Sequence, residues 1–239
     1  MNERCWLGED APFIDRVFVE SPANRVTIGR FGGDSNEGQT KNEDGCLVWW
    51  DQDKDWEFAV LLDAHDTAQS AQLVLNYIKN AEDDLKDLFR MDTGQAFNEL
   101  EVYVLSMFKS ERFRNACETI QGETSCVLVF RKDHYLWWFS VGDCILHLYH
   151  DELAEWGEFQ QNHRSFYEWI GENSTFNRSI PCYSTGRKEL RQGQNIICLT
   201  TDGLLESKQL SYQNPVLIFD RLRTNGIQAV VLSKPCSDF

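Results

Sequence analysis

The spacing of apolar residues along the chain predicts a protein of short strands with a few helices between them. Seven apolar runs have the length of a strand, and turn-forming residues bound most of them. Among them, the run after Gly45 is apolar at every position up to Trp50, which indicates a buried strand. The seven runs are Arg25–Phe31, Gly45–Trp50, Glu57–Leu62, Ser125–Phe130, Tyr135–Val141, Ile145–Tyr149 and Asn195–Thr201.

Helices are predicted where apolar residues recur every three or four positions. This spacing occurs in Thr67–Asn80 and in Gly94–Lys109, and shorter helices are expected at Phe166–Ile170 and Pro215–Thr224. Ile227–Leu232 fits either a last strand or the end of a helix. Strands at hairpin spacing, with two helices inserted after the third, predict an antiparallel α+β domain built in layers.

The composition is that of an ordinary globular protein with a strong negative charge. Hydrophobic residues make up 42% and charged residues 26%, and we expect the 239 residues to form a single domain. The formal net charge of −15 repels nucleic acid phosphates and anionic membranes, so neither is an expected partner. No apolar run approaches the roughly 20 residues that cross a bilayer, and the N-terminus lacks the pattern of a signal peptide. A cytoplasmic location is expected.

The eight cysteines are scattered and form no CxxC pair. Cys46, Cys126, Cys144 and Cys198 fall within predicted strands. We expect the cysteines to be small buried residues in a reducing compartment, rather than disulfide partners or zinc ligands.

Acidic residues recur at the ends of the predicted strands. Glu43 and Asp44 precede one strand, whereas Asp63, Asp143 and Asp202 each follow one. Each alone fits an ordinary turn, but together they favour a cation site, because a strand end holds a side chain rigidly. Carboxylates without cysteine or paired histidine suit Mg²⁺ or Mn²⁺ rather than zinc.

Five short motifs, in the order NED, LLDAHD, GETS, SVGDC and LTTDGL, resemble those of the metal-dependent protein phosphatases of the 2C type. The usual motifs of that family are N-E-D, D-G-H-G, G-S/T-T-A, N-x-G-D-S-R and S-D-G. The resemblance begins near Gly32 and extends at least to Leu205, and the chain looks like a short, bacterial-like member. It implies an αββα sandwich of two antiparallel sheets flanked by helices, with a two-metal site at one edge. It also implies hydrolysis of phosphoserine and phosphothreonine in phosphorylated proteins by a metal-bridging water.

The resemblance also implies a role for individual residues. Asp44 and Asp63 match the core metal ligands, and His65 matches the acid that protonates the leaving alkoxide. The implied cofactors are two Mn²⁺ or Mg²⁺ ions, with a third held more weakly at Asp143. The full set implied to hold metal, directly or through water, is Glu43, Asp44, Asp63, Ala64 through its carbonyl oxygen, Asp143, Asp202 and Asp238.

Several positions depart from the family pattern. Gln39 stands where the family has its phosphate-binding arginine, and Lys41 can substitute only as a point charge without a bidentate fork. Asp66 replaces the glycine after His65, and Ile145 stands where an arginine is usual. These changes motivate an alternative function, a catalytically weak or inactive pseudophosphatase that binds or regulates. A two-metal hydrolase of small phosphate esters is a third possibility.

Two further expectations concern the second half of the chain. Residues 151–190 correspond to the variable flap segment of the family, which can contact substrate. Its aromatic residues Phe166, Tyr167 and Trp169 are expected to pack in a small core rather than to line a peptide groove. Only Phe239 follows Asp238, so the resemblance predicts that the last core strand of the family is missing.

Overall fold

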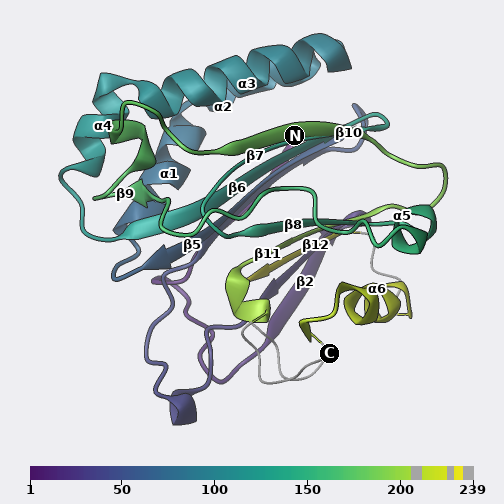
Figure 1. Cartoon of the computed structure of the whole chain (residues 1–239), viewed down its shortest axis with the longest axis horizontal. Helices are drawn as coiled ribbons and strands as arrows, with labels where there is room; N and C mark the ends of the chain where they lie inside the picture. Colours follow the sequence, from purple (N-terminus) through teal and green to yellow (C-terminus); the bar gives the residue numbers. More distant parts are fainter. Residues whose placement is uncertain (206–211, 225–228, 234–239) are drawn as a thin grey trace.

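The computed structural model is a sandwich of two β-sheets with helices on its outer sides (Figure 1). It describes residues 1–205, 212–224 and 229–233. In spatial order the large sheet contains β1 (Asn2–Leu7), β4 (Gly45–Asp51), β5 (Trp56–His65), β6 (Glu123–Lys132), β7 (Tyr135–Val141) and β10 (Ser184–Glu189), and β9 (Ile170–Gly171) pairs with β6. The small sheet contains β2 (Phe18–Ala23), β3 (Val26–Arg30), β12 (Ala229–Ser233), β11 (Ile196–Thr200) and β8 (Ile145–Tyr149).

The helices lie on both outer sides of the sandwich. Figure 1 shows four of them over the large sheet: α1 (Gln69–Asn80), α2 (Glu82–Arg90), α3 (Thr93–Lys109) and α4 (Glu111–Cys117). On the side of the small sheet lie α5 (Asp151–Glu155) and α6 (Pro215–Thr224). In the described part of the chain, no helix has both the length and the apolar character that a membrane span requires.

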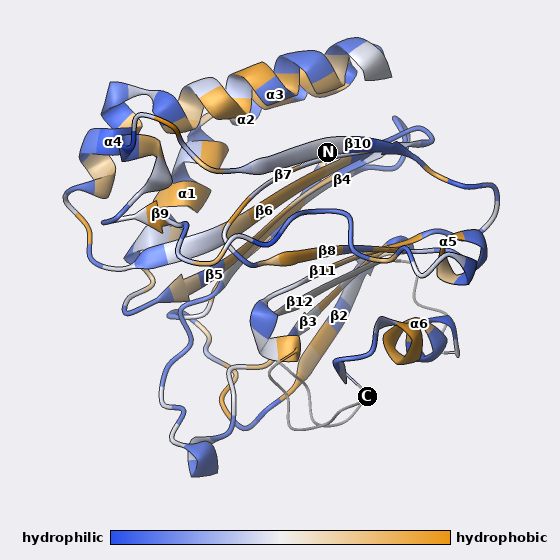
Figure 2. Cartoon of the chain, viewed as in Figure 1, coloured by the Kyte–Doolittle hydropathy of each residue, from blue (hydrophilic) through white to orange (hydrophobic). Residues whose placement is uncertain are grey.

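Two hydrophobic layers explain why the central strands are apolar at almost every position. In β4, Leu47 and Trp49 pack against the helices, whereas Cys46 and Val48 pack between the two sheets. Successive side chains of a strand point to opposite faces, so a strand covered on both faces needs apolar residues throughout. The strands β5 to β8 are accordingly mostly hydrophobic, whereas the loops are more often hydrophilic (Figure 2).

The predicted strands and the predicted α+β layering are confirmed, with small changes at the ends of the elements. The large sheet is antiparallel throughout, as predicted, but the small sheet is mixed. Its strand β12 runs parallel to both neighbours, β3 and β11. The reason is that α6 connects β11 to β12, and a helical crossover brings the chain back in the same direction.

Some elements do not match the sequence-based expectation. Residues 166–167 form a turn and Ile170 begins β9, so the predicted helix is absent there, because Tyr167 has a φ of +66°, a left-handed conformation that ends helical geometry. The edge strands β1, β2 and β10 were not predicted, since most of their residues are exposed or half-buried and lack a clear apolar pattern.

The seven cysteines of the described residues are free, and five of them are buried. The burial of Cys46, Cys126, Cys144 and Cys198 agrees with the expectation from the sequence, whereas Cys5 and Cys182 are exposed, contrary to it. Burial of Cys126 deprives its thiolate of hydration and raises the pKa of the thiol well above its usual range.

Candidate active site

Asp44 and Asp63 come together at one edge of the large sheet because their strands are neighbours. The antiparallel register pairs Gly45 of β4 with Leu62 of β5. One further step along each strand brings Asp44 level with Asp63. Both carboxylates are buried, with exposed fractions of 0% and 2%.

The alternation of side chains turns both carboxylates towards the space between the sheets. Cys46 in β4 and Leu61 in β5 pack in the inter-sheet layer, and Asp44 and Asp63 lie two residues away from them on the same faces. Burial is the main cause that raises the pKa of the Cys144 thiol, and the negative charges of Asp63, Asp143 and Asp44 raise it further. The three carboxylates therefore lie near one buried sulfur.

Ser125 connects Asp143 to this edge. It lies opposite Asp63 in the β5–β6 pairing, and its hydroxyl lies 2.5 Å from a carboxylate oxygen of Asp143. The same hydroxyl accepts a hydrogen bond from the Asp143 amide at 3.2 Å. The serine of the GETS motif therefore holds Asp143 at the same edge as Asp63.

Asp202 lies at the corresponding end of the small sheet. The last residue of β11, Thr200, pairs with Ile145 of β8. If the register continued for two more residues, Asp202 would be level with Asp143. Asp202 begins the short 3₁₀ helix η3 (Asp202–Leu204) and is partly exposed. Asp44, Asp63 and Asp143 thus lie at one edge of the sandwich, the acidic edge, and Asp202 follows the end of the strand that pairs with β8.

His65 and Ala64 end strand β5. The imidazole of His65 is about half exposed, and its Nδ1 lies 4.0 Å from a carboxylate oxygen of Asp63. Ala64 is buried against the helical layer and pairs with Thr124 of β6. Thr124 donates a hydrogen bond of 3.0 Å to the carbonyl oxygen of Asp63, which fixes the end of the strand.

Glu43 makes an ion pair with Lys41. The Lys41 ammonium also donates a hydrogen bond of 2.6 Å to the carbonyl oxygen of Asp66. Its hydrogen bond to Glu43 raises the pKa of Lys41. The amide of Gln39 donates to the carbonyl oxygen of Lys41 at 2.6 Å, so Gln39 contributes to the shape of the loop.

Arg164 is a residue at this edge that the sequence did not single out. Its Nε donates a hydrogen bond of 3.0 Å to the carbonyl oxygen of Asp143, and its guanidinium lies over the ring of Phe166 at 4.9 Å. Motif spacing could not identify Arg164, because it lies in the irregular segment after β8. The only available signal was a cation in a segment that the resemblance places near substrate.

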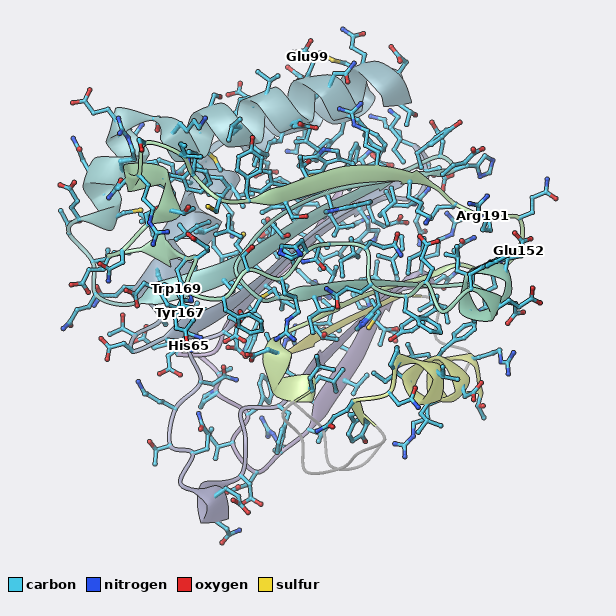
Figure 3. All side chains as sticks on the ribbon, in the orientation of Figure 1. His65, Glu99, Glu152, Tyr167, Trp169 and Arg191 are labelled. Carbon is cyan, nitrogen blue, oxygen red and sulfur yellow. The ribbon has the colours of Figure 1, made fainter. Side chains whose placement is uncertain are left out.

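The aromatic residues of this segment are not buried in a small core, contrary to the expectation. Phe166 and Tyr167 are 59% and 77% exposed. The rings of Tyr167 and Trp169 meet edge-on, with 6.0 Å between their centroids. His65, Tyr167 and Trp169 all lie at the same end of the molecule, opposite to Arg191 and Glu152 (Figure 3). The reason is the turn at residues 166–167, which points the rings outward instead of placing them on one face of a helix.

The described residues suit a cation that keeps much of its water shell. Asp44 and Asp63 offer hard oxygen donors in a buried position, as Mg²⁺ and Mn²⁺ prefer. Among the described residues, no three side chains of histidine, cysteine, aspartate or glutamate converge into a ready-made metal cage. Magnesium is commonly held by only one or two carboxylates together with water and substrate phosphate, so the donor set fits it. Asp238 lies outside the described residues.

Comparison with known proteins identifies the fold. No family model and no curated protein matches the sequence. A bacterial serine phosphatase bearing a single arginine substitution matches the structure with a TM-score of 0.56 at 16% identity, covering 89% of this chain and 90% of that one. The serine/threonine phosphatase Stp1 from Staphylococcus aureus matches with a TM-score of 0.51 at 14% identity, covering 88% and 87%.

At sequence identities of 16% and 14%, these similarities show a shared fold and not a shared function. The match extends over most of both chains, and the order of the sequence motifs follows the strand ends that form the acidic edge. The predicted α+β sandwich is therefore confirmed, and this chain has the fold of the 2C-type serine/threonine phosphatases.

Proposed function

We propose that this protein is a divalent-metal-dependent phosphatase that hydrolyses phosphoserine and phosphothreonine in protein substrates. One observation carries the proposal: buried Asp44 and Asp63 are level on neighbouring strands, and Ser125 holds Asp143 beside them. Adjacent buried carboxylates repel each other, and a bound cation would offset that repulsion. The same edge is open to solvent at His65.

In this proposal the acids at the strand ends hold the metal. Asp44, Asp63 and Asp202 would be direct ligands, and Asp143 would serve a weaker site. Glu43 would hold metal-bound water, and Ala64 would contribute its carbonyl oxygen. When bound, Mg²⁺ or Mn²⁺ lowers the pKa of water and neutralises negative charge that develops on the phosphoryl group.

His65 is the proposed general acid. Its exposed imidazole can reach a substrate oxygen, and its Nδ1 lies 4.0 Å from a carboxylate oxygen of Asp63. A protonated imidazole can donate to the leaving alkoxide of serine or threonine, which would otherwise depart as a strong base. Lys41, and the polar amide of Gln39, are proposed to lie near the incoming phosphate.

The alternative is a pseudophosphatase that binds phosphoproteins without efficient turnover. It is favoured by the contacts of Lys41, whose ammonium is bound to Glu43 and to the Asp66 carbonyl oxygen. A lysine held in this way is less available to a phosphate than an arginine fork would be. The intact set of Asp44, Asp63 and His65 favours the enzyme.

A panel of phosphoserine and phosphothreonine peptides, assayed with and without Mn²⁺ or Mg²⁺, tests the proposal. We expect phosphate release that requires added metal and stops on chelation. A small phosphate ester assayed beside the peptides distinguishes a protein phosphatase from a hydrolase of small esters. Metal-dependent binding of the peptides without any release of phosphate would instead support the pseudophosphatase.

A further inference from the structure

The segment of residues 159–165 runs along strand β8 towards the acidic edge. The Leu148 amide donates to the carbonyl oxygen of Phe159, and the Gln161 amide donates to that of Leu146. These contacts extend the small sheet by one irregular edge segment, so the course of residues 159–165 is fixed by β8. Three further hydrogen bonds continue the series to the strand end: Asn162 Nδ2 to the Cys144 carbonyl oxygen, Arg164 Nε to that of Asp143, and the Ser165 amide to that of Gly142.

The guanidinium of Arg164 is held in place without losing its charge. Its Nε binds a main-chain carbonyl oxygen of Asp143, and the ring of Phe166 supports the guanidinium at 4.9 Å. In the described part of the chain it forms no ion pair with a carboxylate. The positive charge of Arg164 also acts on His147: burial is the main cause that lowers the pKa of that histidine, and Arg164 lowers it further.

Two other cations near this edge, among the residues that the structure describes, are already bound to carboxylates. Lys41 pairs with Glu43, and Arg178 makes two hydrogen bonds of 2.7 Å to the carboxylate of Glu168. A phosphate dianion approaching a chain of net charge −15 needs a local cation to offset the repulsion. Arg164 is in position to supply it.

We propose that Arg164 binds the substrate phosphate at this site, in place of the arginine that the 2C-type phosphatases carry at the position of Gln39. This inference rests on the proposed function, since it concerns the same acidic edge. With Nε bound to Asp143, the two terminal nitrogens of the guanidinium can donate to two phosphate oxygens, a geometry that favours arginine over lysine. Arg164 thereby links the phosphate to the strand end that carries Asp143.

Binding of inorganic phosphate to the Mg²⁺-loaded protein, measured by isothermal titration calorimetry, tests the proposal directly. We expect Arg164→Ala to weaken phosphate binding about tenfold or more. Arg164→Lys should recover part of the affinity, whereas Arg164→Gln, which keeps a donor for the Asp143 carbonyl oxygen but no charge, should not. Recovery by glutamine and not by lysine would identify a merely structural role and overturn the proposal.

Arg191→Ala is the matched control, because it removes one positive charge at the opposite end of the molecule (Figure 3). It should bind phosphate as the wild type does, and an equal loss in this variant would overturn the assignment. Phosphate binding by the wild type that is unchanged in Arg164→Ala, or absent altogether, would also overturn it.

Phosphopeptide hydrolysis separates the inference from the function on which it rests. If phosphate binding depends on Arg164 but no peptide is hydrolysed, the proposed enzyme is wrong and the role of Arg164 stands. If peptides are hydrolysed and Arg164→Ala leaves their KM unchanged, the enzyme stands and the role of Arg164 is wrong.

Discussion

Ser125 and Asp143, 18 residues apart in the chain, are joined by two hydrogen bonds through one hydroxyl group. Ser125 belongs to β6 of the large sheet, whereas Asp143 leads into β8 of the small sheet. The pair therefore fastens the two sheets together at the acidic edge. Gly142 allows this close approach, because it adopts a φ of +85° beside the serine.

Replacement of Gly142 by alanine should disrupt this junction. A Cβ at residue 142 would lie 2.3 Å from the Ser125 hydroxyl oxygen, in addition to the strain of a left-handed backbone. We expect Gly142→Ala to lower the free energy of unfolding by about 3 kcal/mol, combining strain and overpacking. Denaturant unfolding measures the change.

Gly38→Ala is the control for Gly142→Ala. Gly38 has a φ of +91°, but a Cβ added at this residue would have no atom of another segment within 4 Å. Its replacement should cost only the backbone strain, about 1 kcal/mol. Equal destabilisation by the two variants would show that the contact with Ser125 is unimportant.

Replacement of a proposed metal ligand should abolish metal-dependent hydrolysis. We expect Asp63→Asn and Asp202→Asn each to reduce Mn²⁺-dependent cleavage of an aryl phosphate by more than about 100-fold, because even changes to the residues that only orient metal ligands cost roughly 10–100-fold. Asp87→Asn, which alters an exposed carboxylate paired with Arg90, is the control. Substantial turnover by either ligand variant at saturating metal would contradict the assignment.

The role of His65 can be tested through the leaving group. A general acid matters most when the leaving oxygen is strongly basic, as in an alkyl phosphate. His65→Ala should therefore slow hydrolysis of a phosphoserine peptide by about 100-fold and that of nitrophenyl phosphate far less. Equal slowing of the two substrates in steady-state assays would exclude the acid role.

His147 should make the fold sensitive to acid. Burial, together with the positive charge of Arg164, lowers the pKa of His147 to about 4. The unfolded chain, with an ordinary histidine pKa near 6.5, takes up the proton first as the pH falls. Stability is therefore lost between about pH 6.5 and pH 4, by roughly 3 kcal/mol in all.

A variant without this titration should resist acid better than the wild type. His147→Phe keeps a ring to stack on Tyr149, which lies 5.4 Å away between ring centroids. From pH 7 to pH 4.5, its free energy of unfolding should fall less than that of the wild type. Parallel pH profiles for the two proteins would refute this contribution.

The sequence alone determined the central strands and the strand ends at which Asp44 and Asp63 lie. The uninterrupted apolar run after Gly45 required burial on both faces, and the structure places β4 between two hydrophobic layers. Asp44 and Asp63 flank strands that pair in antiparallel fashion, so their positions at the strand ends were sufficient to bring them level. Local patterns and neighbouring strands carry this information.

Only the tertiary structure decided the contacts between segments that have no periodic pattern. The parallel course of β12 depends on the crossover through α6, and the turn at Tyr167 replaces the predicted helix. Arg164 meets Asp143 because residues 159–165 follow β8 by hydrogen bonds to main-chain atoms. Apart from proline, every residue carries the same backbone donor and acceptor, so such contacts leave no signature in the sequence.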